Sequence, residues 1–168
     1  MNNLISGCLP CDILAGKRIE PGGVLYEDAH WHVGMKMGPV FWPGFLIVKL
    51  KRHCEHMAAL TPAEANLLGP LLRHSCQAVS NVLNPAKVYV CSFGDGVHHI
   101  HFWILPRPVE MRPGMHWTIL NLDLRTLLTD RLGIKRWQCN QGEVADLADM
   151  LRQQYHLLRQ DDFTSIAG

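Results

Sequence analysis

Three of the ten histidines in this chain stand within four positions of one another in residues 96–107, GVHHIHFWILPR. The apolar remainder of this segment is typical of a buried strand. Alternate side chains of a strand share a face, which puts His99, His101 and Trp103 together. His98 falls on the core side, where we expect a hydrogen-bonded structural role. Because a neutral imidazole is both a nucleophile and a metal ligand near pH 7, two histidines on one face indicate a chemical site.

A second set of reactive side chains is the C-x-x-C motif formed by Cys8 and Cys11. In a chain of this size without secretory features, paired cysteines more often bind a metal or do redox chemistry than form a disulfide framework. The alternative is a reduced, metal-free pair. The four other cysteines have no such spacing, and we expect them to be small buried apolar residues.

The overall composition is that of an ordinary globular protein, with 168 residues, 48% of them hydrophobic and 18% charged. This length predicts one domain with an extension. A net charge of +1 gives no reason to expect long nucleic acid as a partner. No apolar run reaches the ~20 residues of a membrane span, and the first residues lack the layout of a signal peptide. We therefore expect a cytoplasmic protein with no membrane association.

The elements that must position the reactive residues follow an α+β pattern with an antiparallel sheet. Thr61, Pro62 and Glu64 form a helix start with a capping box, and helical spacing continues to about residue 82. We expect strands over residues 24–28, 30–36, 45–50, 87–93 and 97–107, and C-terminal helices over residues 120–132 and 143–158.

The histidine strand resembles the signature of the histidine triad (HIT) family, in which three histidines alternate with apolar residues; Pro-Arg follows the motif here. In this register His99 is the first histidine, His101 is the middle one, and Trp103 stands where the third normally does. Other segments fall in family order: CLPCDI at 8–13, VLYED at 24–28, PGFLIVKLKRH at 43–53 and the helix start at 60–61.

The resemblance covers residues 8 to 107 and implies a HIT-like fold. In that fold residues 1–107 would form a domain with an antiparallel sheet and one long helix. Residues 108–168 match nothing in the family, and we expect a mostly helical extension that packs on the same domain.

The resemblance also implies a reaction at a nucleotide phosphate. The middle histidine of the family attacks the α-phosphorus, so His101 would form a nucleotidyl intermediate that water or a second phosphate removes. Ser92 and Gly94 would contact the phosphate beside His99, His101 and Trp103, although Ser92 could equally be a polar strand end. The expected activity is hydrolysis of a dinucleoside polyphosphate or a similar nucleotide conjugate by a homodimer. Nucleotidyl transfer or phosphorolysis, and nucleotide binding without turnover, are the alternatives.

Zinc-bearing members of the family suggest a metal site made by Cys8, Cys11, His53 and His99. Two thiolates with two imidazoles are typical of a structural zinc ion. Such an ion would hold the N-terminal segment against the histidine strand. His56 is the rival of His53 as the third ligand, and the family register favours His53.

Trp103 is the departure from the family pattern. An indole donates one hydrogen bond, accepts none and carries no proton at neutral pH. The leaving group would therefore have to depart without a proton from this position. A polyphosphate meets this condition better than an amine does.

Overall fold

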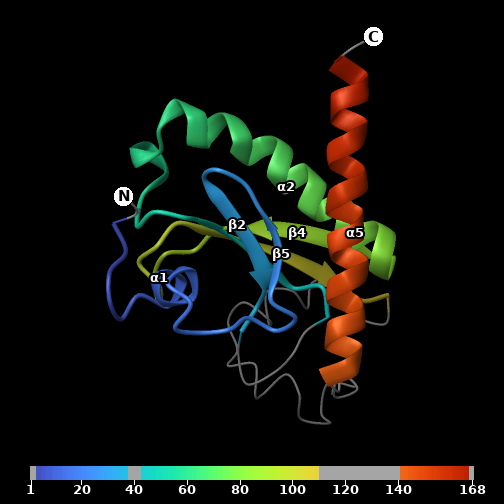
Figure 1. The fold of residues 1–168 in the computed structure, drawn as a ribbon, viewed down its shortest axis with the longest axis horizontal. Helices are drawn as coiled ribbons and strands as arrows, with labels where there is room; N and C mark the ends of the chain where they lie inside the picture. Colours follow the sequence, from blue (N-terminus) through green and yellow to red (C-terminus); the bar gives the residue numbers. More distant parts are fainter. Residues whose placement is uncertain (1–2, 38–42, 110–140, 167–168) are drawn as a thin grey trace.

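The computed structural model describes residues 3–37, 43–109 and 141–166, which contain a five-stranded antiparallel sheet in the order β1-β2-β3-β5-β4. The helices pack around this sheet, so the predicted α+β class is confirmed (Figure 1). The strands are β1 (Val24–Glu27), β2 (Trp31–Met35), β3 (Leu46–Leu50), β4 (Lys87–Cys91) and β5 (His101–Arg107). The helices are α1 (Leu9–Leu14), the 3-10 turn η1 (Met57–Ala59), α2 (Pro62–Leu83) and α5 (Gln141–Ile166).

The two faces of the sheet differ in polarity because successive residues of a strand point to opposite sides. One face carries apolar side chains such as Val48 and Phe102, which are buried in a core shared with Leu71 of α2. Their immediate neighbours on these strands, Lys49 and His101, point to the opposite face. The apolar face holds the fold together, and the opposite face carries the polar groups.

The long helix α2 begins and ends where its sequence predicts. The Thr61 hydroxyl accepts a hydrogen bond from the Glu64 backbone N–H, and the Glu64 carboxylate accepts one from the Thr61 N–H. Pro62 fits the first turn because its missing N–H has no partner there in any helix. The helix ends at Leu83, and the left-handed backbone of Asn84 provides the C-cap. The predicted helix over residues 61–82 is thus confirmed.

Helix α5 contains the predicted helix over residues 143–158 and packs against α2 and β1 (Figure 1). The ring of Tyr155 stacks on Tyr26 with centroids 5.2 Å apart, and its hydroxyl donates to Ser75 Oγ over 2.8 Å. The other predicted helix, over residues 120–132, lies outside the described residues. The division of the chain at residue 107 stays a prediction.

One side chain of α5 reaches the loop that leads into β1. Arg152 donates hydrogen bonds to the backbone carbonyls of Gly22 and Val24, the latter over 2.9 Å. Gly22 has a φ of +68°, and a Cβ at this position would lie 2.5 Å from the Cβ of Ala148. A glycine is therefore required at residue 22 both by the turn and by the close approach of α5.

The histidine strand begins later than predicted, at His101 rather than at residue 97. The preceding residues turn sharply, with the His99 N–H bonded to the Val97 carbonyl over 2.8 Å. The Ile100 N–H then bonds to the Cys54 carbonyl over 2.6 Å, outside the regular ladder. His98 is exposed, so the prediction that it faces the core is wrong.

Within the described ranges, no helix has the length and apolar character needed to cross a membrane.

Candidate functional site

Two cysteines at the start of α1 form one half of a side-chain cluster. Cys8 is the residue before the helix and Cys11 lies in its first turn, so their three-residue spacing puts both thiols on one side. Pro10 occupies this first turn, where its lack of an N–H is harmless. Cys11 is buried and Cys8 is half-buried.

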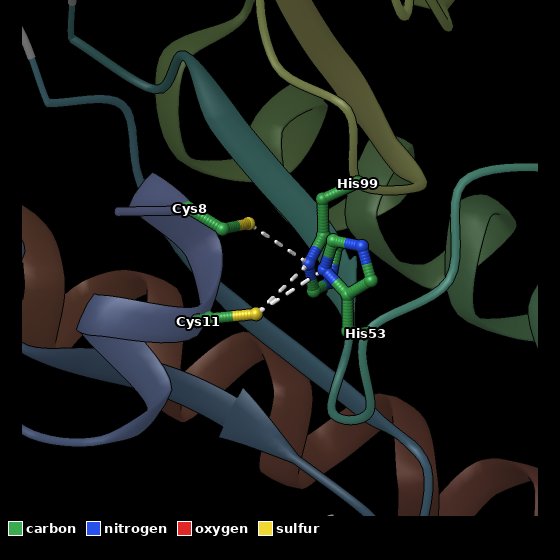
Figure 2. Close-up of side chains that lie close together, drawn as sticks. All are labelled: Cys8, Cys11, His53 and His99. Carbon is green, nitrogen blue, oxygen red and sulfur yellow. Dashed lines mark hydrogen bonds between the residues drawn. The ribbon is translucent and has the colours of Figure 1, made fainter. Parts of the chain in front are cut away.

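Two histidines from separate loops form the other half. His53 follows β3, and His99 precedes β5, its neighbour in the sheet. The hydrogen bond from the Leu50 N–H to the Ile100 carbonyl (3.4 Å) helps to hold these two segments side by side. Figure 2 shows both imidazoles directed toward the two cysteine sulfurs.

The four ligand atoms lie within 4.8 Å of one another. His99 Nδ1 is 3.4 Å from Cys8 Sγ and 3.5 Å from Cys11 Sγ, and His53 Nδ1 is 3.4 Å from Cys11 Sγ. With ordinary zinc–sulfur and zinc–nitrogen bonds, the sulfur-to-nitrogen edge of a tetrahedron is about 3.6 Å. The four residues predicted as ligands therefore have the donor types and the spacing that fit a zinc ion.

The remaining ring nitrogens of the two histidines are also hydrogen-bonded. His99 Nε2 donates to the backbone carbonyl of Leu50 over 2.8 Å, which leaves Nδ1 unprotonated. His53 Nε2 lies 3.4 Å from the Glu55 carboxylate. Partners of this kind orient metal-binding histidines and fix their tautomer. The rival candidate His56 is exposed and lies outside the cluster.

Burial shifts the pKa of two residues of this cluster, His99 and Cys8. It lowers the pKa of His99 to about 4, so the ring is neutral and its lone pair is available near pH 7. Burial also raises the pKa of the Cys8 thiol to about 11. A thiolate at this position therefore requires a bound cation, and the donor set suits zinc.

His101 is adjacent to this cluster, at the first residue of β5. It is 7% exposed, and its Nδ1 lies 2.6 Å from the backbone carbonyl of His99. A carbonyl only accepts hydrogen bonds, so Nδ1 must carry the proton and Nε2 of the neutral ring keeps its lone pair. The fold thus fixes the tautomer of His101 that can act as a nucleophile through Nε2.

Ser92 and Gly94 lie just beyond β4 and are both exposed. The Ser92 hydroxyl donates to the backbone carbonyl of His101 over 2.8 Å, so it joins the end of β4 to β5. A phosphate oxygen needs a donor, and this hydroxyl hydrogen is already in use. The backbone near Gly94 is open, because a Cβ there would meet nothing within 4 Å.

Trp103 points to the same face of the sheet as His101 and lies in an aromatic cluster. Its ring makes edge contacts with Phe45 and Phe93, with centroids 5.3 and 5.4 Å away. Phe45 is buried, whereas Phe93 is 43% exposed and Trp103 is half-buried. Trp103, at the third motif position, thus borders the site together with two phenylalanine rings.

Sequence reasoning missed a buried ionic group on the same face. Glu20 bonds to both His32 and Lys49. A charged or titratable residue inside each of two apolar strands was the available signal for His32 and Lys49. Glu20 lies in a loop and no local pattern marks it.

The architecture is similar to that of solved histidine triad proteins. No protein-family model matches the sequence, and no curated protein matches it. A zinc-bound histidine triad family protein from Mycobacterium smegmatis superposes with a TM-score of 0.61 at 19% identity, over 94% of this chain and 97% of that one. A hypothetical histidine triad nucleotide-binding protein from Sulfolobus tokodaii gives a TM-score of 0.65 at 16% identity, over 90% and 94%. A HIT family protein from Bacillus anthracis gives 0.55 at 25% identity, over 62% and 76%.

Proposed function

Because the chain has the histidine triad fold, we propose that it hydrolyses a dinucleoside polyphosphate, or a related nucleotide conjugate, through a nucleotidyl intermediate on His101. The observation that carries this proposal is the hydrogen bond from His101 Nδ1 to the His99 carbonyl. It keeps the lone pair of Nε2 available on the polar face of the sheet. A histidine prepared in this way can attack phosphorus through Nε2.

In the proposed first step, the Nε2 lone pair of His101 forms a bond to the α-phosphorus. The bond from this phosphorus to the bridging oxygen breaks, and its electron pair leaves with the departing polyphosphate. Nδ1 keeps its proton, and the His99 carbonyl stabilises the positive charge that the ring acquires. In the second step a water oxygen attacks the phosphorus, the electron pair of the nitrogen–phosphorus bond returns to Nε2, and the water proton is released to solvent.

Zinc has a structural role in this proposal. Cys8, Cys11, His53 and His99 would hold the ion, which supplies four bonds between α1 and the loops that flank β3 and β5. Because His99 would be one of the four ligands, the ion would also hold the His99 carbonyl in place for its hydrogen bond with His101. The zinc-bound relative from Mycobacterium smegmatis supports this assignment.

Trp103 favours substrates whose leaving group needs no proton. An indole cannot protonate a departing amine, whereas a polyphosphate departs as a stable anion at neutral pH. The same feature is compatible with transfer to inorganic phosphate, which makes phosphorolysis the second candidate.

From the family resemblance we also propose that the protein is cytoplasmic and forms a homodimer. Strand β4 is an edge of the sheet in the described residues, and its Val90 is 44% exposed, which suits contact with a second copy. Light scattering of the purified chain would test the assembly.

The decisive experiment is incubation with diadenosine tetraphosphate, followed by detection of the products. Hydrolysis releases mononucleotide, and rapid quenching followed by mass spectrometry should find a nucleotide on His101. A diphosphate product that appears only when inorganic phosphate is added would identify phosphorolysis instead. Binding without any product would show that the protein is a nucleotide-binding module.

A further inference from the structure

Three buried polar side chains lie together on the sheet face that carries His101. Glu20, His32 and Lys49 are only 5%, 4% and 1% exposed. They come from the loop before β1, from β2 and from β3 respectively. The proposed metal site and the proposed nucleophile use none of them.

The three side chains form one connected network. His32 Nε2 lies 2.6 Å from one oxygen of the Glu20 carboxylate, and the Lys49 ammonium donates to the other oxygen. Burial would raise the pKa of Glu20, but the His32 hydrogen bond and the Lys49 charge outweigh it and lower that pKa. Glu20 is therefore a carboxylate. Burial lowers the pKa of Lys49 below its ordinary value, but the charge and the hydrogen bond of Glu20 oppose this shift and favour the ammonium form.

The sheet makes room for this network at Gly34. A Cβ on Gly34 would collide with the Glu20 carboxylate, so only glycine lets the carboxylate lie flat against β2. With both oxygens occupied and one face against the backbone, Glu20 has little freedom to move.

The strand register places the network beside His101. His32 pairs with Lys49 across β2 and β3, and Lys49 pairs with His101 across β3 and β5. Directly opposite residues in an antiparallel sheet have Cβ atoms about 4.5–5.5 Å apart on the same face. The stem of Lys49 therefore flanks the imidazole of His101, and its ammonium group bonds to Glu20.

Packing alone does not account for a lysine at residue 49. Methionine at residue 49 together with glutamine at residue 20 would fill this interior without the free-energy cost of removing two charges from water. The structure instead keeps the charge and fixes it with Glu20, which His32 holds in turn. A phosphate substrate brings negative charge to this face, and a nearby cation that is already oriented stabilises it without further rearrangement.

We propose that Lys49 is a positioning residue for nucleotidyl transfer, which orients the His101 ring and stabilises the anionic phosphate there, and that Glu20 and His32 hold it in place. This inference rests on the proposed function. It adds Lys49, which no part of the histidine motif contains, to the residues that support the covalent step.

The test compares Lys49→Met, which keeps the volume and removes the charge, with Lys49→Arg, which keeps the charge. With diadenosine tetraphosphate we expect Lys49→Met to lower kcat by at least about tenfold and to change KM by less than about threefold. Lys49→Arg should restore most of kcat. The control is Lys87→Met, which removes the charge of the exposed Lys87 at the start of β4 and should leave kcat unchanged.

A second variant covers the case in which Lys49→Met fails to fold because Glu20 loses its partner. Glu20→Gln combined with Lys49→Met replaces the ion pair by neutral residues of similar size, and it should fold and remain slow. A folded charge-free variant whose kcat is within about twofold of the wild type would overturn the inference. If the wild type itself forms no nucleotidyl-His101, the proposed function fails and this proposal fails with it.

Discussion

The backbone carbonyl of His99 accepts the Nδ1 hydrogen of His101 over 2.6 Å, while the His99 side chain points to Cys8 and Cys11. The same residue therefore contributes its ring to the candidate metal site and its carbonyl to the candidate nucleophile. This link predicts that changes in the metal site reach the reaction without any contact between metal and substrate.

The first prediction concerns the nucleophile. His101→Asn should lower turnover of diadenosine tetraphosphate by at least about a thousandfold, because the covalent bond forms only on this ring. Nucleotide affinity, measured by calorimetry, should change little, because the ring contributes mainly to the transition state. His98→Asn is the matched control, since the adjacent His98 is exposed. Near-normal turnover in His101→Asn would show that another residue is the nucleophile.

The second prediction concerns zinc. Metal analysis of protein purified without added metal should find one zinc per chain, and Cys8→Ser with Cys11→Ser should remove it. Loss of four metal bonds should lower the free energy of unfolding by at least about 2 kcal/mol, and the Tm should fall by several degrees. Cys76→Ser is the control, because Cys76 is half-buried in α2 and lies outside the cluster. Unchanged zinc content and Tm in the double variant would remove the metal site from the proposal.

The third prediction concerns the leaving group. Trp103→His should raise activity on an adenosine phosphoramidate relative to diadenosine tetraphosphate, because imidazole can give a proton to a departing amine. The smaller ring also leaves a cavity between Phe45 and Phe93, which could lower both rates together. The ratio of the two rates is therefore the quantity to measure. Trp103→Phe, which keeps an aromatic ring and adds no proton donor, should leave that ratio unchanged.

The fourth prediction concerns the pH dependence of stability. Hydrogen bonds from Arg52 lower the pKa of the buried Glu64 to about 2, from an ordinary value of 4.5. A lowered folded-state pKa stabilises the fold at pH values above about 4.5, and this contribution is lost as the pH falls toward 2. Glu64→Gln should therefore reduce the free energy of unfolding by about 1–3 kcal/mol at pH 7.

Urea unfolding of both proteins at several pH values would check this. The difference between wild type and Glu64→Gln should shrink between pH 5 and pH 2. Taking the difference cancels any loss of metal at low pH, since both proteins have the same cluster. A difference that is independent of pH would show that Glu64 acts through its hydrogen bonds and not through its charge.

The sequence predicted the parts of the molecule that local patterns determine. The capping box at Thr61 and Glu64 defined the start of α2, and the alternation after His101 defined the two faces of β5. The four cysteine and histidine ligand candidates came from motif order, and the structure brings them together.

The sequence did not predict features that depend on long-range contacts. The strand was expected from residue 97, but the turn that directs His99 toward Cys8 and Cys11 delays it to His101. Glu20 was missed because its role depends on contacts with His32 and Lys49, which lie 12 and 29 residues away in the chain. Burial of a charge is a tertiary property, and no spacing rule reveals it.

The hydrogen bonds from Arg152 to the carbonyls of Gly22 and Val24 extend the reach of the C-terminal helix. Gly22 is two residues from Glu20, and the Gly23 N–H bonds back to the Glu20 carbonyl over 2.9 Å. Helix α5 is thus hydrogen-bonded to the loop that carries Glu20, the partner of Lys49. A chain shortened before residue 141 would keep every residue of the histidine motif, yet it would lose the brace on that loop. We therefore expect that the part of the chain needed for a stable site extends well beyond the histidine motif, at least to Arg152.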